Sequence, residues 1–139
     1  MSVWSGSSLY FRDSSGVEVW RDGVVSTFLP GVAWITPKAS PGGGQIVYEA
    51  RDTQGSAHVF VVDTSSGNVR DLGKERAEPA FLTSRYIWYE VESPCVAAGA
   101  CEPSFPGIAS GTTYIYDLHD GTETESMITS VVDVWPHPA

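Results

Sequence analysis

The chain has 139 residues, of which 42% are hydrophobic and 18% are charged. This composition is that of one folded globular domain rather than of a disordered chain. The formal net charge is −9 and the eight basic residues are scattered. This argues against a nucleic-acid partner, because neutralising phosphates requires clustered Lys and Arg. No apolar run approaches the ~20 residues of a membrane-spanning helix, so no membrane span is expected.

Turn-forming residues separate short apolar runs throughout the sequence. Fourteen glycines and nine prolines are spread in this way, which indicates many turns and therefore β structure. The N-terminal residues MSVWSGSS lack both the basic and the apolar segment of a secretion signal. The protein therefore either stays inside the cell, or Met1 begins a piece of something longer.

Three successive segments resemble one another, each made of strand-like runs rich in Val, Ile, Tyr and Phe that end in Asp, Ser and Gly. Each segment starts with a small or apolar residue followed by an aromatic one: Val3-Trp4, Ala33-Trp34 and Ala80-Phe81, with a further copy at Val134-Trp135. The next strand is predicted within residues 7–16, 45–55 and 85–93, and the strand after it within 17–23, 58–67 and 113–121. A short polar or mixed strand follows each of these.

The repeat is therefore predicted to have four strands. The copies recur at roughly 44 residues, which is the length of a propeller blade. We place the blades at residues 4–31, 32–78 and 79–130, with 131–139 as a closing strand. Insertions at 36–44 and 92–111 make the copies unequal. The predicted fold class is all-β and propeller-type, with about three four-stranded antiparallel blades.

The central strands of each repeat are apolar at consecutive positions, as in VFVV (59–62) and YIWY (86–89). This pattern is typical of a strand that is covered on both faces, as it is when each blade packs between two neighbours. A two-layer sandwich, in which each strand has one polar face, is the structural alternative.

The order of an aromatic-marked strand, an LYF or IVY strand, a VFVVD strand ending in a glycine turn, and a polar strand resembles the repeats of TolB-like, WD-repeat-like β-propellers. Similar blades occur in the prolyl oligopeptidase family. The resemblance covers nearly the whole chain, but the usual Ser-Pro-Asp-Gly turn after the first strand is absent. The second copy has SPGGG at 40–44 instead. Such propellers serve many unrelated tasks, so the resemblance implies a fold more than a function.

The function that this resemblance favours is a non-catalytic module for binding or scaffolding through protein–protein contacts. The alternative is a saccharide-binding or enzyme-associated propeller, which acts on a glycan or gates a peptidase domain, with Glu90 and Glu92 as the acids to test. No catalytic, cofactor-binding or metal-binding residue is predicted. The sequence contains no serine-hydrolase elbow, phosphate loop or calcium loop.

Three blades alone would leave two apolar sheet faces in water, whereas propellers have at least four blades. We expect two copies to form a homodimer by strand exchange. The C-terminal strand of each, carrying Val134 and Trp135, would complete the other's first blade, where only a stub of the first strand is present. The result would be a six-bladed ring. The alternative is that the chain is part of one longer propeller.

Cys95 and Cys101 are the only cysteines. The five residues between them, flanked by Pro and Gly, allow a disulfide; two free thiols, or a metal or redox role, are the alternatives. A disulfide would indicate a periplasmic or secreted protein. The loop it would pin lies on the face that receives ligands in propellers, so Glu92, Phe105 and Ile108 are candidate contact residues. The other interpretation is a loop that only needs pinning.

The remaining notable residues are expected to be structural. His58, His119 and His137 are far apart in the repeat, and each is expected to be exposed. The segment 74–76, KER, is expected to be a solvated charge cluster. The aromatic residues are expected to pack between blades: Trp20, Trp34, Trp88, Tyr48, Tyr89 and Tyr116.

Overall fold

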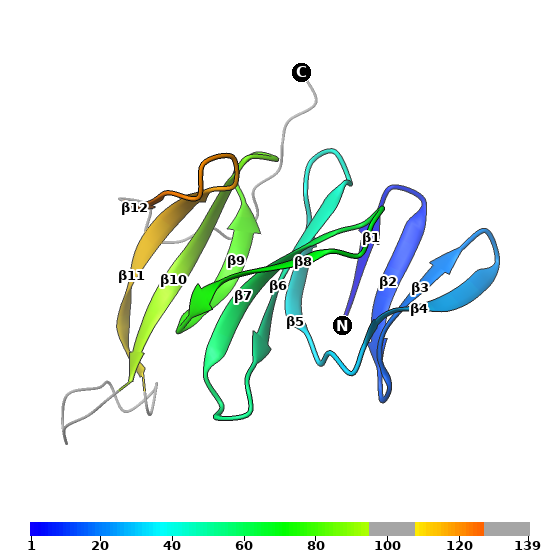
Figure 1. The fold of residues 1–139 in the computed structure, drawn as a ribbon, viewed down its shortest axis with the longest axis horizontal. Helices are drawn as coiled ribbons and strands as arrows, with labels where there is room; N and C mark the ends of the chain where they lie inside the picture. The colour runs from blue at the N-terminus through cyan, green and yellow to red at the C-terminus, as the bar shows by residue number, and fades with distance from the viewer. Residues whose placement is uncertain (95–107, 127–139) are drawn as a thin grey trace.

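The computed structural model describes residues 1–94 and 108–126, with side chains for 1–91 and 112–126, and these form three four-stranded antiparallel sheets (Figure 1). The first sheet contains β1 (Ser2–Ser5), β2 (Ser8–Asp13), β3 (Gly16–Arg21) and β4 (Val24–Pro30). The second contains β5 (Ile35–Ala39), β6 (Gln45–Arg51), β7 (Ala57–Asp63) and β8 (Val69–Lys74). The third contains β9 (Arg76–Phe81), β10 (Tyr86–Pro94), β11 (Ile108–Asp117) and β12 (Glu123–Glu125).

The three sheets stand side by side in the order of the chain, with the second sheet in the middle (Figure 1). Within each sheet, strands that are consecutive in sequence pair with each other. No helix occurs in the described ranges, and a search of them for a helix able to cross a membrane finds none. The predicted propeller-type fold is confirmed, and the two-layer sandwich is wrong, because three sheets succeed one another rather than two facing each other.

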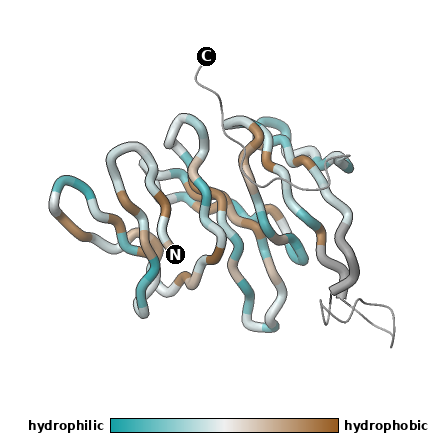
Figure 2. The backbone as a smooth tube through the Cα atoms, turned by 180° about the vertical axis from the view of Figure 1, so that it is seen from behind, coloured by the Kyte–Doolittle hydropathy of each residue, from teal (hydrophilic) through white to brown (hydrophobic). Residues whose placement is uncertain are grey.

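The middle sheet is buried on both faces because alternate residues of its central strands point in opposite directions. Ile46, Tyr48 and Val62 pack against the first sheet. Val47 and Val61, their immediate neighbours in sequence, pack against the third sheet. The hydrophobic segments accordingly lie along the strands, while hydrophilic colour appears at turns (Figure 2). The consecutive apolar positions of the sequence are thus explained by burial on both sides.

Arginine side chains connect neighbouring sheets. The Nη1 of Arg12, in the first sheet, donates to the carbonyl oxygen of Trp34 at 3.0 Å, just before the second sheet begins. Arg70 of the second sheet donates to the Leu118 carbonyl, just after β11, at 3.0 Å and to the hydroxyl of Tyr116 in the third sheet at 2.9 Å. Since the guanidinium group has several donors in fixed directions, these contacts fix the position of one sheet relative to the next.

The aromatic mark at the start of each repeat does not occupy one structural position. Trp4 and Phe81 lie in β1 and β9, the first strands of their sheets. In each case, one further residue pair lies between the aromatic residue and the turn that follows the strand. In the second sheet, Ala39 holds that position, while Trp34 lies before β5 and is fully buried. The sequence resemblance therefore matched residues that are not equivalent in the fold.

The first sheet is complete, since β1 pairs with β2 along Ser2–Ser5. The expected stub is thus a full, though short, inner strand, and the premise for strand exchange is removed. The third sheet also differs from expectation, because β10 and β11 continue pairing to Pro94 and Ile108. The insertion predicted at 92–111 therefore begins and ends as strand.

Arg76 is not the solvated charge that the sequence suggested. Its Nη2 lies 2.6 Å from a carboxylate oxygen of Glu123, its Nη1 donates to the Lys74 carbonyl at 2.8 Å, and its guanidinium lies 5.5 Å from the ring centroid of Tyr89. The side chain crosses the face of the third sheet from β9 to β12 and is mostly buried.

We predict that Gly16→Ala lowers the free energy of unfolding by at least about 2 kcal/mol. Gly16 has a φ of +133°, and an added Cβ would lie 2.4 Å from the Leu29 carbonyl oxygen and 2.5 Å from the Gly31 nitrogen. Urea unfolding measures the change. Gly42→Ala is the matched control, because a Cβ there meets nothing within 4 Å. Equal losses in both variants would contradict the prediction.

Candidate binding groove and its polar neighbours

An open groove of about 670 Å³ lies between the first and second sheets. One side is the link between β4 and β5, residues 31–33, which contains only small or β-branched residues. The other side is formed by Ile35, Tyr48, Ala50 and Phe60 of the second sheet. The β6–β7 turn and the β4–β5 link both lie on the lower side of the molecule in Figure 1.

An aromatic row forms the floor of this groove. Tyr48 and Phe60 are directly opposite on β6 and β7, and their rings stack with centroids 5.3 Å apart. Trp34 extends the row on one side, 5.6 Å from Tyr48, and His58 extends it on the other, stacked 5.7 Å from Phe60. Because the residues of one strand face point the same way every second position, the register of β6 and β7 places these rings side by side.

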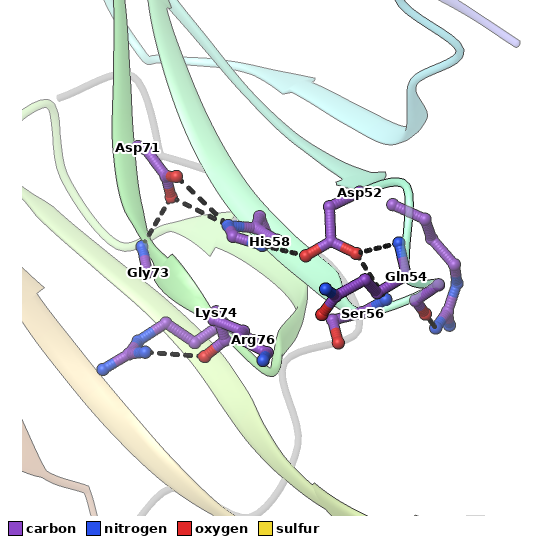
Figure 3. A network of polar contacts seen from close by, with 10 residues as sticks. Asp52, Gln54, Ser56, His58, Asp71, Gly73, Lys74 and Arg76 are labelled. Atoms are coloured by element: carbon purple, nitrogen blue, oxygen red, sulfur yellow. Dashed lines mark hydrogen bonds and ion pairs between the residues drawn. The ribbon is translucent and has the colours of Figure 1, made fainter.

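His58 lies between two carboxylates at the end of this row (Figure 3). Its Nε2 is 2.8 Å from Asp52 and its Nδ1 is 3.1 Å from Asp71. Each carboxylate is held in turn by backbone donors: Ser56 N–H donates to Asp52 at 3.0 Å, and Gly73 N–H donates to Asp71 at 2.8 Å. The imidazole side chain is only 16% exposed, so the expectation of a solvent-exposed His58 is wrong.

The electrostatics of this cluster favour a protonated imidazole. Burial lowers the pKa of His58, but the hydrogen bonds and charges of Asp52 and Asp71 outweigh burial and raise that pKa above 6.5. The hydrogen bond with His58, followed by that from Ser56, lowers the pKa of Asp52. Both ring nitrogens face acceptors, so only the doubly protonated ring donates to both. Burial, with the nearby charge of Asp71, raises the pKa of Tyr48.

Most of the predicted site residues fall elsewhere. Cys95, Cys101, Phe105, Val134 and Trp135 lie outside the described residues. The backbones of Glu92 and Ile108 belong to β10 and β11, and these ends of the two strands point toward the same lower side as the β6–β7 turn (Figure 1).

Of the aromatic residues expected to pack between sheets, Trp34, Tyr48, Trp88 and Tyr89 are buried. Trp20 is exposed, contrary to that expectation.

The groove and the His58 cluster were missed by sequence reasoning. The spacing of Tyr48 and Phe60 is a signal that was available, since both lie on one face of a predicted hairpin. Among residues 1–94 and 108–126, no group of three or more His, Cys, Asp or Glu side chains is arranged to hold a metal ion. The groove combines an apolar floor with one cation at Arg51, and a charged cluster lies beside it.

The sheets and their stacking define a partial β-propeller. Among solved structures, an acylaminoacyl peptidase in complex with Z-Gly-Gly-Phe-chloromethyl ketone is similar with a TM-score of 0.58 and 11% identity, over 91% of this chain and 25% of that one. TolB from Acinetobacter baumannii gives a TM-score of 0.55 and 13% identity, over 86% and 29%. Kuenenia stuttgartiensis hydrazine synthase gives 0.54 and 17%, over 86% and 39%.

The likeness at these identities concerns the fold alone. The chain spans between 25% and 39% of the length of these three structures. No family model matches the sequence, and no curated protein matches it. The TolB-like resemblance inferred from the repeat is therefore confirmed for the fold.

We predict that His58 makes stability depend on pH. Because the pKa of His58 is raised on folding, its contribution is complete below the unfolded-state pKa of about 6.5 and is lost as pH rises through the folded-state pKa. Wild-type protein and His58→Gln should therefore differ most in urea-unfolding free energy near about pH 5, where the imidazole is protonated in both states and the carboxylates are still ionised, and the difference should shrink at alkaline pH.

A second variant provides the internal check. Asp71→Asn keeps an oxygen acceptor for the Gly73 amide but removes one charge, so it should bring the pKa of His58 closer to its ordinary value, as followed by NMR of the ring. A stability difference that is independent of pH, or an unchanged ring titration in Asp71→Asn, would contradict the assignment.

Proposed function

We propose that this protein is a non-catalytic β-propeller module for protein–protein binding or scaffolding. The observation that carries the proposal is the open groove, whose floor is the Tyr48–Phe60 stack. Concave, mainly apolar sites with a few polar groups at the margin are the usual form of binding pockets. A large apolar side chain from an extended segment of a partner fits a groove of about 670 Å³.

The residues at the rim of the groove are also suited to an extended partner segment with a large apolar side chain. Ala33 and Val69 are exposed at its edges, and the Arg51 side chain is about half exposed. Arg51 also donates to the Gly55 carbonyl at 2.9 Å, which fixes it on the β6–β7 turn. A carbonyl or carboxylate of the partner next to its apolar side chain would meet this fixed cation.

The long β10–β11 hairpin extends the proposed contact region. Its ends, with Glu92 and Ile108, point to the same side of the molecule as the β6–β7 turn (Figure 1), and Arg51 just before that turn lines the groove. We keep Glu92, Phe105 and Ile108 as a second set of candidate contacts. They would approach the same partner from the third sheet.

The alternative is a propeller associated with an enzyme or a saccharide. It is favoured by the similarity to an acylaminoacyl peptidase bound to a peptide-derived chloromethyl ketone. It predicts either activity that depends on Glu90 or Glu92, or binding of a glycan. A binding module predicts neither turnover nor dependence on these acids.

We also infer that the protein associates with itself. The first sheet needs no strand from another copy, because β1 already occupies the inner position. Contact with a second copy would then use the face of a sheet rather than its edge.

We predict that Ala33→Trp blocks the groove without affecting folding, since Ala33 is exposed at its edge. Peptides selected from a random displayed library against the wild-type protein should carry a large apolar residue. They should bind Ala33→Trp at least about tenfold more weakly, a loss of about 1.4 kcal/mol. Thr53→Trp, exposed on the β6–β7 turn, is the matched control. Equal binding by all three proteins would refute the groove as the site.

The location of the protein is proposed to be extracytoplasmic, on the condition that Cys95 and Cys101 form a disulfide. Thiol quantification on the denatured, unreduced protein should then find no free thiol, and two after reduction. Two free thiols before reduction, in protein prepared under oxidising conditions, would refute both the disulfide and the location drawn from it.

A further inference from the structure

The second and third sheets can be compared residue by residue, because their first strands carry the same irregularity. In each sheet, two residues of the first strand lie opposite a single tyrosine of the second strand, Tyr48 or Tyr89. The flanking pairs are Ile35–Glu49 and Lys38–Val47 in the second sheet, and Ala77–Glu90 and Ala80–Trp88 in the third. Tyr48, which forms part of the groove floor, therefore corresponds to Tyr89.

The two sheets differ at an equivalent position on their fourth strands. The row of directly opposite residues next to the tyrosine runs Ile46–Val62–Val69 in the second sheet and Ile87–Tyr116–Glu123 in the third. Val69, which lines the groove, therefore corresponds to Glu123. An apolar side chain stands in one sheet where a carboxylate stands in the other.

In the third sheet, one side chain of the protein itself connects these two positions. The guanidinium carbon of Arg76 lies 5.5 Å from the ring centroid of Tyr89, and its Nη2 lies 2.6 Å from a carboxylate oxygen of Glu123. A flat group thus covers the tyrosine, and a carboxylate on the fourth strand neutralises its charge.

The second sheet lacks such a side chain on the side of its fourth strand. Trp34 directly precedes Ile35, as Arg76 precedes Ala77, and its ring lies 5.6 Å from Tyr48. However, the Nε1 of Trp34 donates to the carbonyl of Met1 at 3.4 Å, so the indole is directed toward the first sheet. The groove of about 670 Å³ is therefore the space that corresponds to the position of the Arg76 guanidinium in the third sheet.

The charges at the groove do not suit a second guanidinium. Among the described residues that line the groove, none carries a carboxylate, and Arg51 contributes a cation. The neighbouring acids, Asp52 and Asp71, are paired with His58. A flat group that enters the groove should accordingly be uncharged.

The floor of the groove also favours an aromatic ring over an aliphatic chain. The rings of Tyr48 and Phe60 are within 21° of parallel, with centroids 5.3 Å apart. This separation is too short for two rings that lie edge to edge in one plane, so the rings stand face to face and direct their edges away from the sheet. Ring edges carry the positive end of the aromatic quadrupole and attract the negative face of another ring.

We propose that the groove binds an aromatic side chain from an extended segment of a protein partner. The face of its ring lies against the edges of Tyr48 and Phe60, and Val69 is the residue that excludes a basic side chain from the same position. This inference rests on the proposed function, because it specifies which side chain of the partner the groove accepts.

A peptide selected against the wild-type protein from the displayed library provides the probe. Its anchor, defined as the residue whose replacement by alanine costs the most binding, should be Phe, Tyr or Trp. Replacing this anchor by cyclohexylalanine keeps a large apolar ring but removes the π system, and it should weaken binding at least about threefold by calorimetry. An aliphatic anchor, or equal binding of the cyclohexylalanine peptide, would overturn the proposal.

Val69→Glu tests the comparison with the third sheet. This variant recreates the carboxylate of Glu123, so the same peptide with arginine at the anchor should bind it at least about tenfold more tightly than it binds the wild-type protein. Val24→Glu is the matched control, because it adds the same charge at another exposed valine, in the first sheet. A gain in neither variant, or an equal gain in both, would contradict the role of Val69.

Ala33→Trp separates failure of this proposal from failure of the groove. If Ala33→Trp weakens binding but the phenylalanine and cyclohexylalanine peptides bind equally, the groove remains the site and the aromatic preference is overturned. If Ala33→Trp leaves binding unchanged, or if selection recovers no peptide, both the groove and its preference are refuted.

Discussion

The middle sheet is apolar on both faces, and the rest of the structure depends on how its strands are kept in register. In a sheet with one wet face, a slip by one residue moves hydrophobic side chains into water and is strongly opposed. Here a slip would exchange Val47 for Tyr48 or Val61 for Val62, and both members of each pair are buried. The pattern of hydrophobic and polar side chains therefore specifies the register of these strands only weakly.

The turns between these strands determine their register instead. In the β7–β8 turn, Asp63 accepts hydrogen bonds from the Ser65 amide at 2.8 Å and the Ser66 amide at 3.0 Å. The Ser65 hydroxyl and these amides lower the pKa of Asp63 to about 2, so the carboxylate remains an acceptor across the physiological range. Asp52 closes the β6–β7 turn in the same way through Gln54 and Ser56. A side chain that caps its own turn fixes where each strand begins, and this determines which residues face which neighbour.

The sequence was sufficient to predict the fold, because its evidence was local and repeated. Each blade shows apolar runs bounded by Asp, Ser and Gly, and consecutive apolar positions require two covered faces. It was not sufficient to predict the His58 cluster, because that cluster depends on an irregularity in pairing. Between Val59 and Phe60 the β7–β8 register shifts, so that Asp71, rather than Leu72, lies opposite Phe60.

This bulge explains why the sequence wrongly predicted an exposed His58. Residues opposite one another share a face, so the shift puts Asp71 on the face that carries Phe60 and His58. Without the shift, Leu72 would occupy that place, and His58 would lack its second carboxylate. A bulge adds one residue to one strand and leaves little trace in composition, so neither the ion pair nor the raised pKa of His58 could be read from the sequence.

The groove and the exposed Trp4 of the first sheet have one physical origin, which is that the copies of the repeat have diverged in side-chain size. Phe81 fills the interface between the second and third sheets, whereas the equivalent position in the second sheet is Ala39. Ala39 does not line the groove, where the β4–β5 link contributes the small residues Gly31 and Ala33. Small residues at a sheet interface leave volume, and here that volume is the groove. In the first sheet the equivalent position is Trp4. This side chain is large enough to fill an interface between sheets, as Phe81 does, but it is exposed to solvent. Positions at which the copies of the repeat carry similar side chains therefore account for the packing of the sheets, and positions at which side-chain size differs account for the groove and for the exposed Trp4.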